Sequence, residues 1–312
     1  MNNVFKEISC PVCKQNNFEI VWESTPDEFL SDMRKSYYNL DALNINKDTK
    51  FYIKKCKNCS FVFVNPRLKD ELYNVVYNES KVKQNEVKSW KDEVGTDLNY
   101  LYNTYHKWSV TPSFIRVLSY VKKKFNKAKN DNYERIKLLD YGCGGGHILE
   151  LCKPFGIKGM GVDIDNWRLN HCKSKGLDVC RPEELDNNET FDVIVSTSVV
   201  EHVNDLDAYF SFISKHLKKG GYCSLIGLTP HIIDIEKKKG VYNIVMPLEH
   251  INYFTKKSFD MLIKKHGLKR IKYSNSMKEI SKPIDYVKPF IKNIVFQGFS
   301  PTGSMEVDIV KL

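Results

Sequence analysis

The chain has 312 residues, of which 42% are hydrophobic and 28% charged, and its net charge is +10. This length allows two domains, and the composition is that of a globular protein, which excludes disordered and collagen-like classes. The basic residues are dispersed, which favours a lysine-rich surface over a nucleic-acid interface. No long apolar run and no N-terminal secretion signal are found, so the sequence predicts a cytoplasmic protein without a membrane span.

Two Cys-x-x-Cys pairs mark the first part of the chain, residues 1–70. Cys10 and Cys13 form the first pair, and Cys56 and Cys59 form the second, with 42 residues between the pairs. Four thiolates in two such knuckles suit a closed tetrahedral site for a structural zinc ion. Their separation exceeds that of a compact zinc ribbon, so the loop between them must be long. We expect a zinc-binding module here, and unliganded thiols or a vestigial knuckle are the alternative.

Residues 71–130 show helix-like spacing of apolar side chains and many aromatic residues, which predicts a helical segment or lid. A polar, turn-prone stretch at 127–133 marks a boundary before the last region, 131–312. There, apolar runs of strand length alternate with helical patterns, which is typical of a parallel sheet covered on both faces. The expected strands are 136–142, 158–164, 191–198, 222–228, 268–274 and 304–312, and the expected helices are 147–156, about 205–219 and 255–267.

A glycine-rich turn, DYGCGGGH, follows the first of these strands at residues 140–147. Glycines let the backbone approach a ligand closely, and the next helix offers unpaired N–H groups. A nicotinamide-binding fingerprint would require a glycine at position 147, where this chain has His147. Asp163 ends the second strand 21 residues after Gly142, where a carboxylate can accept hydrogen bonds from ribose hydroxyls. The turn and the acid together predict a nucleoside cofactor, and an oxidoreductase is disfavoured.

Four motifs between residues 136 and 228 resemble those of the class I S-adenosylmethionine-dependent methyltransferases: LLDYGCGGGH, GVDID, FDVIVSTSVVEHV and LKKGGYCSLIGL. The Glu-His-Val ending of the third motif is similar to the small-molecule branch of the family, which includes ubiquinone-type enzymes. The resemblance implies a Rossmann-like α/β fold with a seven-stranded, mostly parallel sheet whose last strand is antiparallel. A doubly wound domain that has lost its cofactor is the alternative.

The resemblance also implies the cofactor contacts. Gly142 and Gly144 approach the methionine part of S-adenosylmethionine, while Asp163 binds the ribose and Ile164 the adenine. The implied set of cofactor-binding residues is Asp140, Gly142, Cys143, Gly144, Asp163, Ile164 and Thr197. Many relatives carry an acidic residue after the third strand, where this chain has Arg181 followed by Pro and Glu.

Two histidines are candidate bases for methyl transfer. Glu201 and His202 follow the fourth strand, at the sheet edge where open α/β sheets bind substrates. A His202 with a pKa near neutral pH can take a proton from a hydroxyl or an enolisable carbon. The alternative is that Glu201 and His202 cap the next helix. His250 lies in PLEHINYF, a region near the substrate entrance in the resembling enzymes, so the expected catalytic residues are His202, His250 and Glu201.

The second cysteine pair is followed by SFVFVNPR, which resembles the C-x-x-C-G-x-x-F-x-x-P-R segment of bacterial enzymes of this type, with Ser60 at the usual glycine. The sequence therefore predicts transfer of a methyl group to oxygen, or to carbon, of a small molecule. The resemblance implies a sugar or nucleotide-sugar acceptor in surface-glycan or natural-product biosynthesis. An RNA-binding or RNA-modifying protein that uses the knuckles and the basic surface is the alternative.

Overall fold

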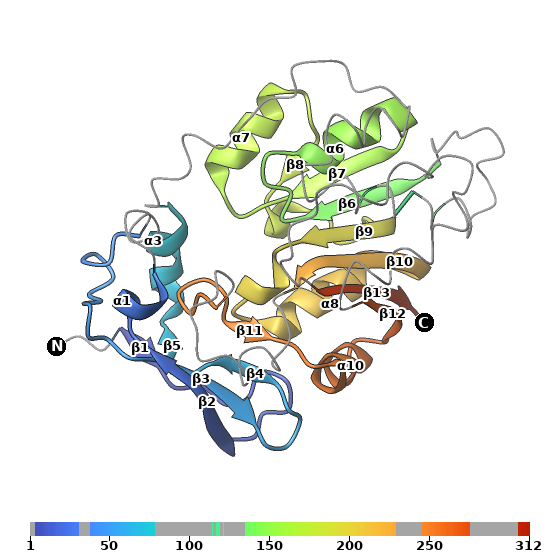
Figure 1. Ribbon diagram of the computed structural model, residues 1–312. Helices are drawn as coiled ribbons and strands as arrows, with labels where there is room; N and C mark the ends of the chain where they lie inside the picture. The colour runs from blue at the N-terminus through green and yellow to red at the C-terminus, as the bar shows by residue number, and fades with distance from the viewer. Residues whose placement is uncertain are drawn as a thin grey trace, which may run out of the picture. The chain divides into compact units, whose positions relative to one another are not determined.

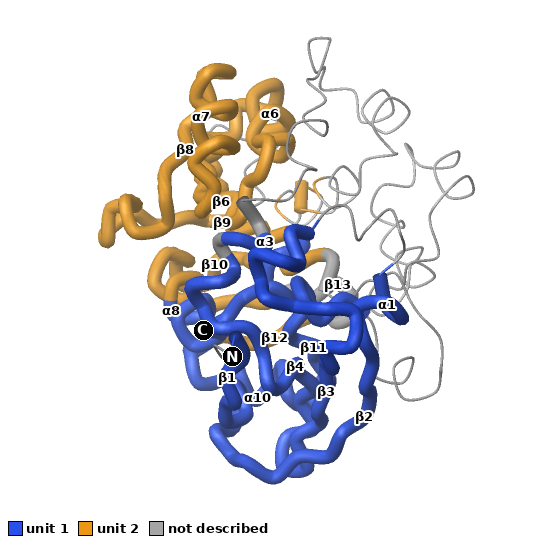
Figure 2. The backbone as a smooth tube through the Cα atoms, turned by 90° about the vertical axis from the view of Figure 1, so that its left-hand side faces the viewer, with its two compact units in different colours: residues 1–88, 198–211, 228–267 blue, residues 89–197, 212–227, 268–312 orange. Residues whose placement is uncertain are grey.

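The computed structural model describes residues 4–30, 38–78, 135–228, 245–274 and 305–312, with the helical residues Phe114, Val117, Leu118 and Val121 (Figure 1). The chain divides into two compact units. Unit 1 comprises residues 1–88, 198–211 and 228–267, and unit 2 comprises residues 89–197, 212–227 and 268–312 (Figure 2). Most of the helical segment predicted at 71–130 lies outside the described residues, and the three consecutive regions expected from the sequence stay a prediction.

Unit 2 is built on a seven-stranded sheet with the order β12-β13-β10-β9-β6-β7-β8. The parallel strands are β6 (Lys137–Tyr141), β7 (Lys158–Val162), β8 (Val179–Cys180), β9 (Phe191–Thr197) and β10 (Leu217–Leu228). An antiparallel pair, β12 (Leu268–Ser274) and β13 (Met305–Lys311), completes the sheet. Consecutive residues of β9, Val193 to Val195, are all buried, as expected of a strand covered on both faces. The predicted Rossmann-like sheet is confirmed.

The helices that follow these strands are α6 (His147–Cys152), extended by the short turn η3 (Lys153–Phe155), then α7 (Asn166–Ser174), η4 (Pro182–Glu184) and α8 (Leu206–His216). Of these, α6 and α8 begin near the predicted positions, whereas α7 and η4 were not predicted from the sequence. The helix expected to reach residue 219 ends at His216 instead. Leu217 already pairs with Phe191 of β9, and the register then shifts before Tyr222, with Gly220 in a left-handed conformation.

Unit 1 contains a four-stranded antiparallel sheet with the order β11-β4-β3-β2. Its strands are β2 (Phe18–Ser24), β3 (Phe51–Cys56), β4 (Val62–Val64) and β11 (Asn252–Tyr253). A separate two-stranded sheet joins β1 (Phe5–Lys6) to β5 (Arg67–Leu68). The helices and turns are α1 (Pro26–Phe29), η1 (Asp70–Leu72), α3 (Tyr73–Asn78), η5 (Val200–His202) and α10 (Lys256–Lys264).

The core of unit 1 combines residues from both ends of the chain. Ile53 and Val62 of the N-terminal strands share one buried cluster with Leu248 and Ile251. Lysines that follow this second segment also reach the knuckles: Lys257 Nζ donates to Asn58 O at 3.0 Å, and Lys265 Nζ to Val12 O at 2.7 Å. The N-terminal module and residues 245–267 therefore form one packed body. Within the described residues, no helix has the length and apolar character needed to cross a membrane.

Candidate functional site

The glycine-rich turn after β6 is shaped by its backbone. Gly142, Gly144 and Gly146 have φ values of +78°, +53° and +80°, a left-handed region that side chains disfavour. The N–H groups of Gly142 and Cys143 both donate to Val162 O, at 2.7 and 3.1 Å. These bonds fix the turn against the end of β7, and Gly146 then begins helix α6.

Asp163 braces this turn. Its Oδ2 accepts a hydrogen bond from Gly144 N at 2.8 Å, and its Oδ1 accepts one from Asp165 N at 2.9 Å. A carboxylate offers about four lone-pair sites, so each oxygen keeps acceptor capacity for a ribose hydroxyl. The residue that the sequence assigned to the ribose thus also holds the loop that carries Gly144.

Three more predicted cofactor residues line the same end of the sheet. Asp140 is 3% exposed, and its burial together with the charge of Asp163 raises the pKa of its carboxyl to about 8. The Thr197 hydroxyl at the end of β9 is buried and has no hydrogen-bond partner among the described residues. A hydrogen bond with Cys172 and burial raise the pKa of the Cys143 thiol, which suits a packing residue and not a nucleophile.

Two exposed apolar side chains follow Asp163. Ile164 is 62% exposed, and Trp167 on α7 is also exposed. Arg181 Nη1 donates to Ile164 O at 2.9 Å and to Asn166 Oδ1 at 3.1 Å. Arg181, which stands where relatives carry an acid, therefore holds this segment in place. The sequence marked Arg181 only as a departure and missed Trp167. An adenosyl ligand fits this donor and acceptor set, because exposed apolar side chains follow directly after the acid assigned to the ribose.

The two candidate bases lie together in unit 1. The rings of His202 and His250 have centroids 4.8 Å apart and planes inclined at 68°. Nδ1 of His202 lies 3.0 Å from Glu249 O. A carbonyl oxygen only accepts hydrogen bonds, so Nδ1 carries the proton and Nε2 is the acceptor nitrogen of the neutral ring. This tautomer suits a group that accepts a proton at Nε2.

Burial sets the charges of this site. Glu201 is 1% exposed, and burial raises the pKa of its carboxyl to about 8. Its Oε1 lies 3.9 Å from His202 Nε2, and its Oε2 has no hydrogen-bond partner in the described part of the chain. Burial and the neighbouring His250 lower the pKa of His202 to about 3, which corrects the expected value near neutral pH. The ligand atoms of Glu201, His202 and His250 lie within 4.8 Å of one another, a spacing that also fits a metal ion.

Backbone contacts from a distant segment support these residues. Asn252 Nδ2 donates to Val200 O at 3.1 Å and to Val203 O at 2.7 Å, and Ile251 N donates to Glu201 O at 2.9 Å. Helix α8 is capped by Asp205, whose Oδ1 accepts from Ala208 N, so capping does not explain Glu201 and His202. The sequence missed Asn252 and the Glu249 carbonyl, because no local pattern marks them.

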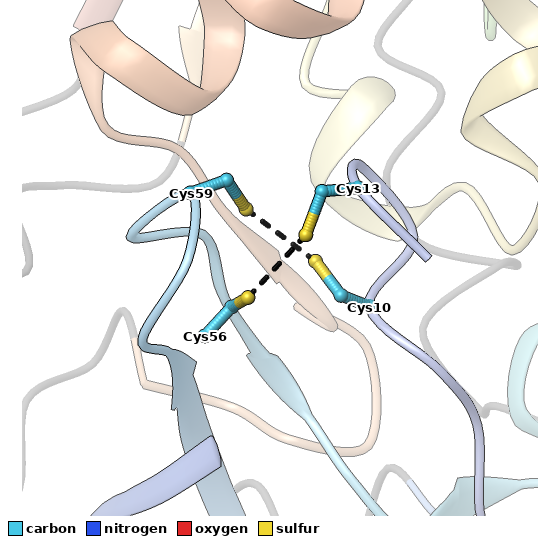
Figure 3. A group of neighbouring side chains, drawn as sticks. All are labelled: Cys10, Cys13, Cys56 and Cys59. Atoms are coloured by element: carbon cyan, nitrogen blue, oxygen red, sulfur yellow. Dashed lines mark hydrogen bonds between the residues drawn. The ribbon is translucent and has the colours of Figure 1, made fainter. Parts of the chain in front are cut away.

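The four cysteines of the two knuckles converge in unit 1, as Figure 3 shows. Sγ of Cys10 lies 3.5 Å from Sγ of Cys59, and Sγ of Cys13 lies 3.5 Å from Sγ of Cys56. Tetrahedral Zn–S bonds of about 2.3 Å place sulfurs about 3.8 Å apart, so this arrangement fits a zinc ion closely. The hydrogen bond from Cys59 lowers the pKa of the Cys10 thiol to about 5, which provides a thiolate ligand.

Both knuckles have the same backbone. Lys14 and Ser60, which directly follow the second cysteine of each pair, have φ values of +60° and +63°. Lys14 N donates to Cys10 O at 2.9 Å, and Ser60 N donates to Cys56 O at 2.8 Å. The left-handed position explains why the resembling enzymes carry glycine where this chain has Ser60.

Comparison with known proteins finds sequences that are similar to part of this chain. A ubiquinone biosynthesis O-methyltransferase of Pelagibacter ubique is 40% identical over 28% of this chain and 40% of its own length. One from Brucella anthropi is 34% identical over 33% of this chain and 48% of its own length. The chain thus spans less than half the length of these relatives.

Solved structures also align with the chain. An S-adenosylmethionine-dependent methyltransferase from Clostridium acetobutylicum aligns at 16% identity and a TM-score of 0.42, over 69% of this chain and 97% of that one. The family described as "Methyltransferase domain" matches residues 114–273, about half of the 312 residues. The chain belongs to this family of methyltransferase domains.

Proposed function

We propose that the protein transfers a methyl group from S-adenosylmethionine to an oxygen atom of a small molecule, with carbon as the second choice of acceptor. The observation that carries this proposal is the turn with left-handed glycines at 142, 144 and 146, braced by Asp163 Oδ2. Family membership supports the reaction class.

The cofactor, when bound, supplies an electrophilic methyl group on a cationic sulfonium. Asp163 accepts hydrogen bonds from the ribose, and the Gly142 and Gly144 backbone admits the methionine part. The buried Asp140 carboxyl, with its pKa raised to about 8, ionises more readily beside a cation. Binding near neutral pH therefore releases a proton from Asp140.

His202 and His250 are the proposed bases that take the proton from the acceptor. The hydroxyl of the acceptor donates to Nε2 of His202, whose tautomer is set by the Glu249 carbonyl. Burial and His250 hold the pKa of His202 at about 3, and ionisation of Glu201, whose Oε1 lies 3.9 Å from Nε2, would favour the protonated ring. His250 is the second base.

The relatives support oxygen as the methylated atom, since those from Pelagibacter and Brucella are named ubiquinone biosynthesis O-methyltransferases. Neither name refers to a sugar. The sugar or nucleotide-sugar acceptor expected from the sequence stays a prediction without support from these relatives. A small molecule is the acceptor class that we propose.

We also infer a structural zinc ion at Cys10, Cys13, Cys56 and Cys59. The support is the pair of 3.5 Å Sγ–Sγ distances and the grouping of all four sulfurs. Protein purified without added metal is expected to contain about one zinc per chain. Less than about a tenth of an equivalent, with no gain in stability on adding zinc, would contradict this.

Calorimetry tests the cofactor. The protein is expected to bind S-adenosylmethionine or its demethylated product, and not NADH. Asp163→Ala is expected to weaken this binding by about 1.5–3 kcal/mol, because charge-assisted hydrogen bonds are lost. Asp178→Ala is the control, since Asp178 is an exposed acid that precedes β8 and is assigned no role in binding. Binding of NADH without S-adenosylmethionine would refute the proposal.

Radiolabelled methyl transfer in a cell extract tests the bases. His202→Ala and His250→Ala are each expected to lower the rate by about 10²–10⁴ while cofactor affinity is nearly unchanged. His266→Ala is the control, because this histidine of unit 1 pairs with Asp207 outside the site. If both variants keep most of the activity, neither histidine is the base, and catalysis depends on the proximity of the reactants alone or on a carboxylate such as Glu201.

A further inference from the structure

A pocket of about 330 Å³ lies in unit 1 and includes none of Glu201, His202 and His250 in its lining. It is formed by residues before and within the first knuckle, by β5 and η1, and by the start of α8. The charged side chains that line it are Lys6, Lys14, Arg67, Asp70 and Asp205. Its volume is that of a small-molecule site.

Arg67 is the unusual member of this lining. It is 6% exposed, and its Nη2 donates to Asn204 O at 2.8 Å. Its Nε and Nη1 are buried, and neither has a hydrogen-bond partner among the described residues. Burial lowers the pKa of Arg67, but a guanidinium keeps its proton in proteins. A buried cation with two unused donors is costly unless an acceptor occupies the space beside it.

The acids of the pocket are engaged elsewhere. Asp70 forms an ion pair with Lys6, and Asp205 Oδ1 accepts from Ala208 N as the cap of α8. No ion pair joins Arg67 to a carboxylate within the described ranges. Lys6 is paired with Asp70, and Lys14 is paired with Asp207 at 2.8 Å, so Arg67 is the cation of this lining that no ion pair neutralises within the described ranges. An incoming anion is therefore the acceptor that Arg67 lacks.

We propose that this pocket binds the phosphoryl group of a small molecule through Arg67. The guanidinium fork matches the oxygens of a phosphate, and Nε and Nη1 are the two donors still unused. The pocket also includes Leu206, the first residue of α8, but Asp205 already caps the N-terminus of that helix, so Arg67 is the group that receives the anion. A phosphate offers more acceptor oxygens than a carboxylate, and so can accept from both unused donors of Arg67 and from the neighbouring Lys6.

Titration of the full chain with inorganic phosphate at constant ionic strength tests this site through the thermal unfolding temperature. Wild type is expected to gain stability saturably. Arg67→Lys removes the fork and Lys6→Gln frees Asp70 to pair with Arg67, so each raises the apparent Kd about tenfold or more. The matched control is Lys50→Gln, because Lys50 forms a 2.6 Å ion pair with Glu23 in the same unit outside this lining.

The same apparent Kd in all four proteins, or no saturable effect in wild type, would overturn the proposal. Acetate that binds as tightly as phosphate would overturn the assignment to a phosphoryl group. Lys6 is partly exposed, so Lys6→Gln decides the question even if Arg67→Lys does not fold. Methyl transfer is not measured, so this result is independent of the proposed activity.

Discussion

The glycine-rich turn of unit 2 and the histidine pair of unit 1 are held in different ways. The turn is fixed by bonds to neighbours close in sequence, such as Gly144 N to Asp163 Oδ2, 19 residues away. The histidine pair depends on long-range contacts: His202 bonds to a carbonyl 47 residues away, and Asn252 to one 52 residues away. A site built from local contacts leaves a sequence motif, whereas one built from distant contacts leaves only isolated residues.

The largest effect is expected when one cysteine of the two knuckles is replaced. Cys59→Ser is expected to abolish zinc binding, which contributes on the order of 10 kcal/mol in structural sites. Hydrogen exchange should then show lost protection in β3, β4 and around His250, with β6 and β7 less affected. Cys180→Ser is the control, because Cys180 lies in unit 2 outside the cysteine cluster. Full zinc content in Cys59→Ser would show that the knuckles do not hold the metal.

A smaller effect is expected within the glycine-rich turn. Gly146 has a φ of +80°, and a Cβ there would lie 2.4 Å from Leu177 Cδ1, so Gly146→Ala combines backbone strain with a clash. We expect a loss of about 2–4 kcal/mol in the free energy of unfolding. Gly145→Ala is the matched control, since its Cβ would meet only the His147 ring, at 3.2 Å. Equal losses in urea unfolding would mean that the turn is not fixed by backbone conformation.

The buried carboxyl of the histidine site predicts a pH effect. The pKa of Glu201 is raised from 4.5 to about 8, so the stabilisation from its bound proton is complete at low pH and is lost as pH rises towards 8. The ionisation of Glu201 alone therefore lowers the stability of the wild-type protein by about 1.4 kcal/mol per pH unit across that window.

Glu201→Gln lacks this dependence, so its stability relative to wild type should rise by about 2 kcal/mol between about pH 6.5 and 8. Urea unfolding at several pH values provides the measurement. Asp140, with its pKa also raised to about 8, contributes equally in both proteins and cancels. Parallel stability profiles for the two proteins would mean that Glu201 is already ionised in the folded state.

The smallest effect concerns the knuckle backbone. Ser60 has a φ of +63°, so Ser60→Gly removes the steric cost of a left-handed side chain. After the entropy cost of glycine, we expect a gain of about 0.5 kcal/mol. Ser9→Gly is the control, since Ser9 is absent from the residues with positive φ and should be destabilised. A loss of stability in Ser60→Gly would show that the knuckle tolerates this conformation at no cost.

Sequence patterns predicted the sheet of unit 2 well because burial on both faces leaves continuous apolar runs, as in β6 and β9. The turn at residues 140–147 and its contact with Asp163 are local and were recognisable. The grouping of the four cysteines also followed from paired motifs. The site-residue roles themselves stay predictions.

Other features had no local signal. The shared core of the N-terminal strands with residues 245–253 depends on packing between segments far apart in sequence. The neutral state of His202 follows from burial, which a sequence window does not report. Arg67 stood inside a recognised motif, but only the structure shows that two of its donors lack a hydrogen-bond partner.

The discontinuous core of unit 1 has a consequence for synthesis of the chain. Val62 and Ile53 pack against Leu248 and Ile251, which are translated nearly 200 residues later. At about 5–20 residues per second, a ribosome needs about 10–40 s to bridge that interval. During this time the nascent N-terminal strands expose the apolar surface that Leu248 and Ile251 later cover. Early zinc capture by the two knuckles would hold those strands together until their partners emerge.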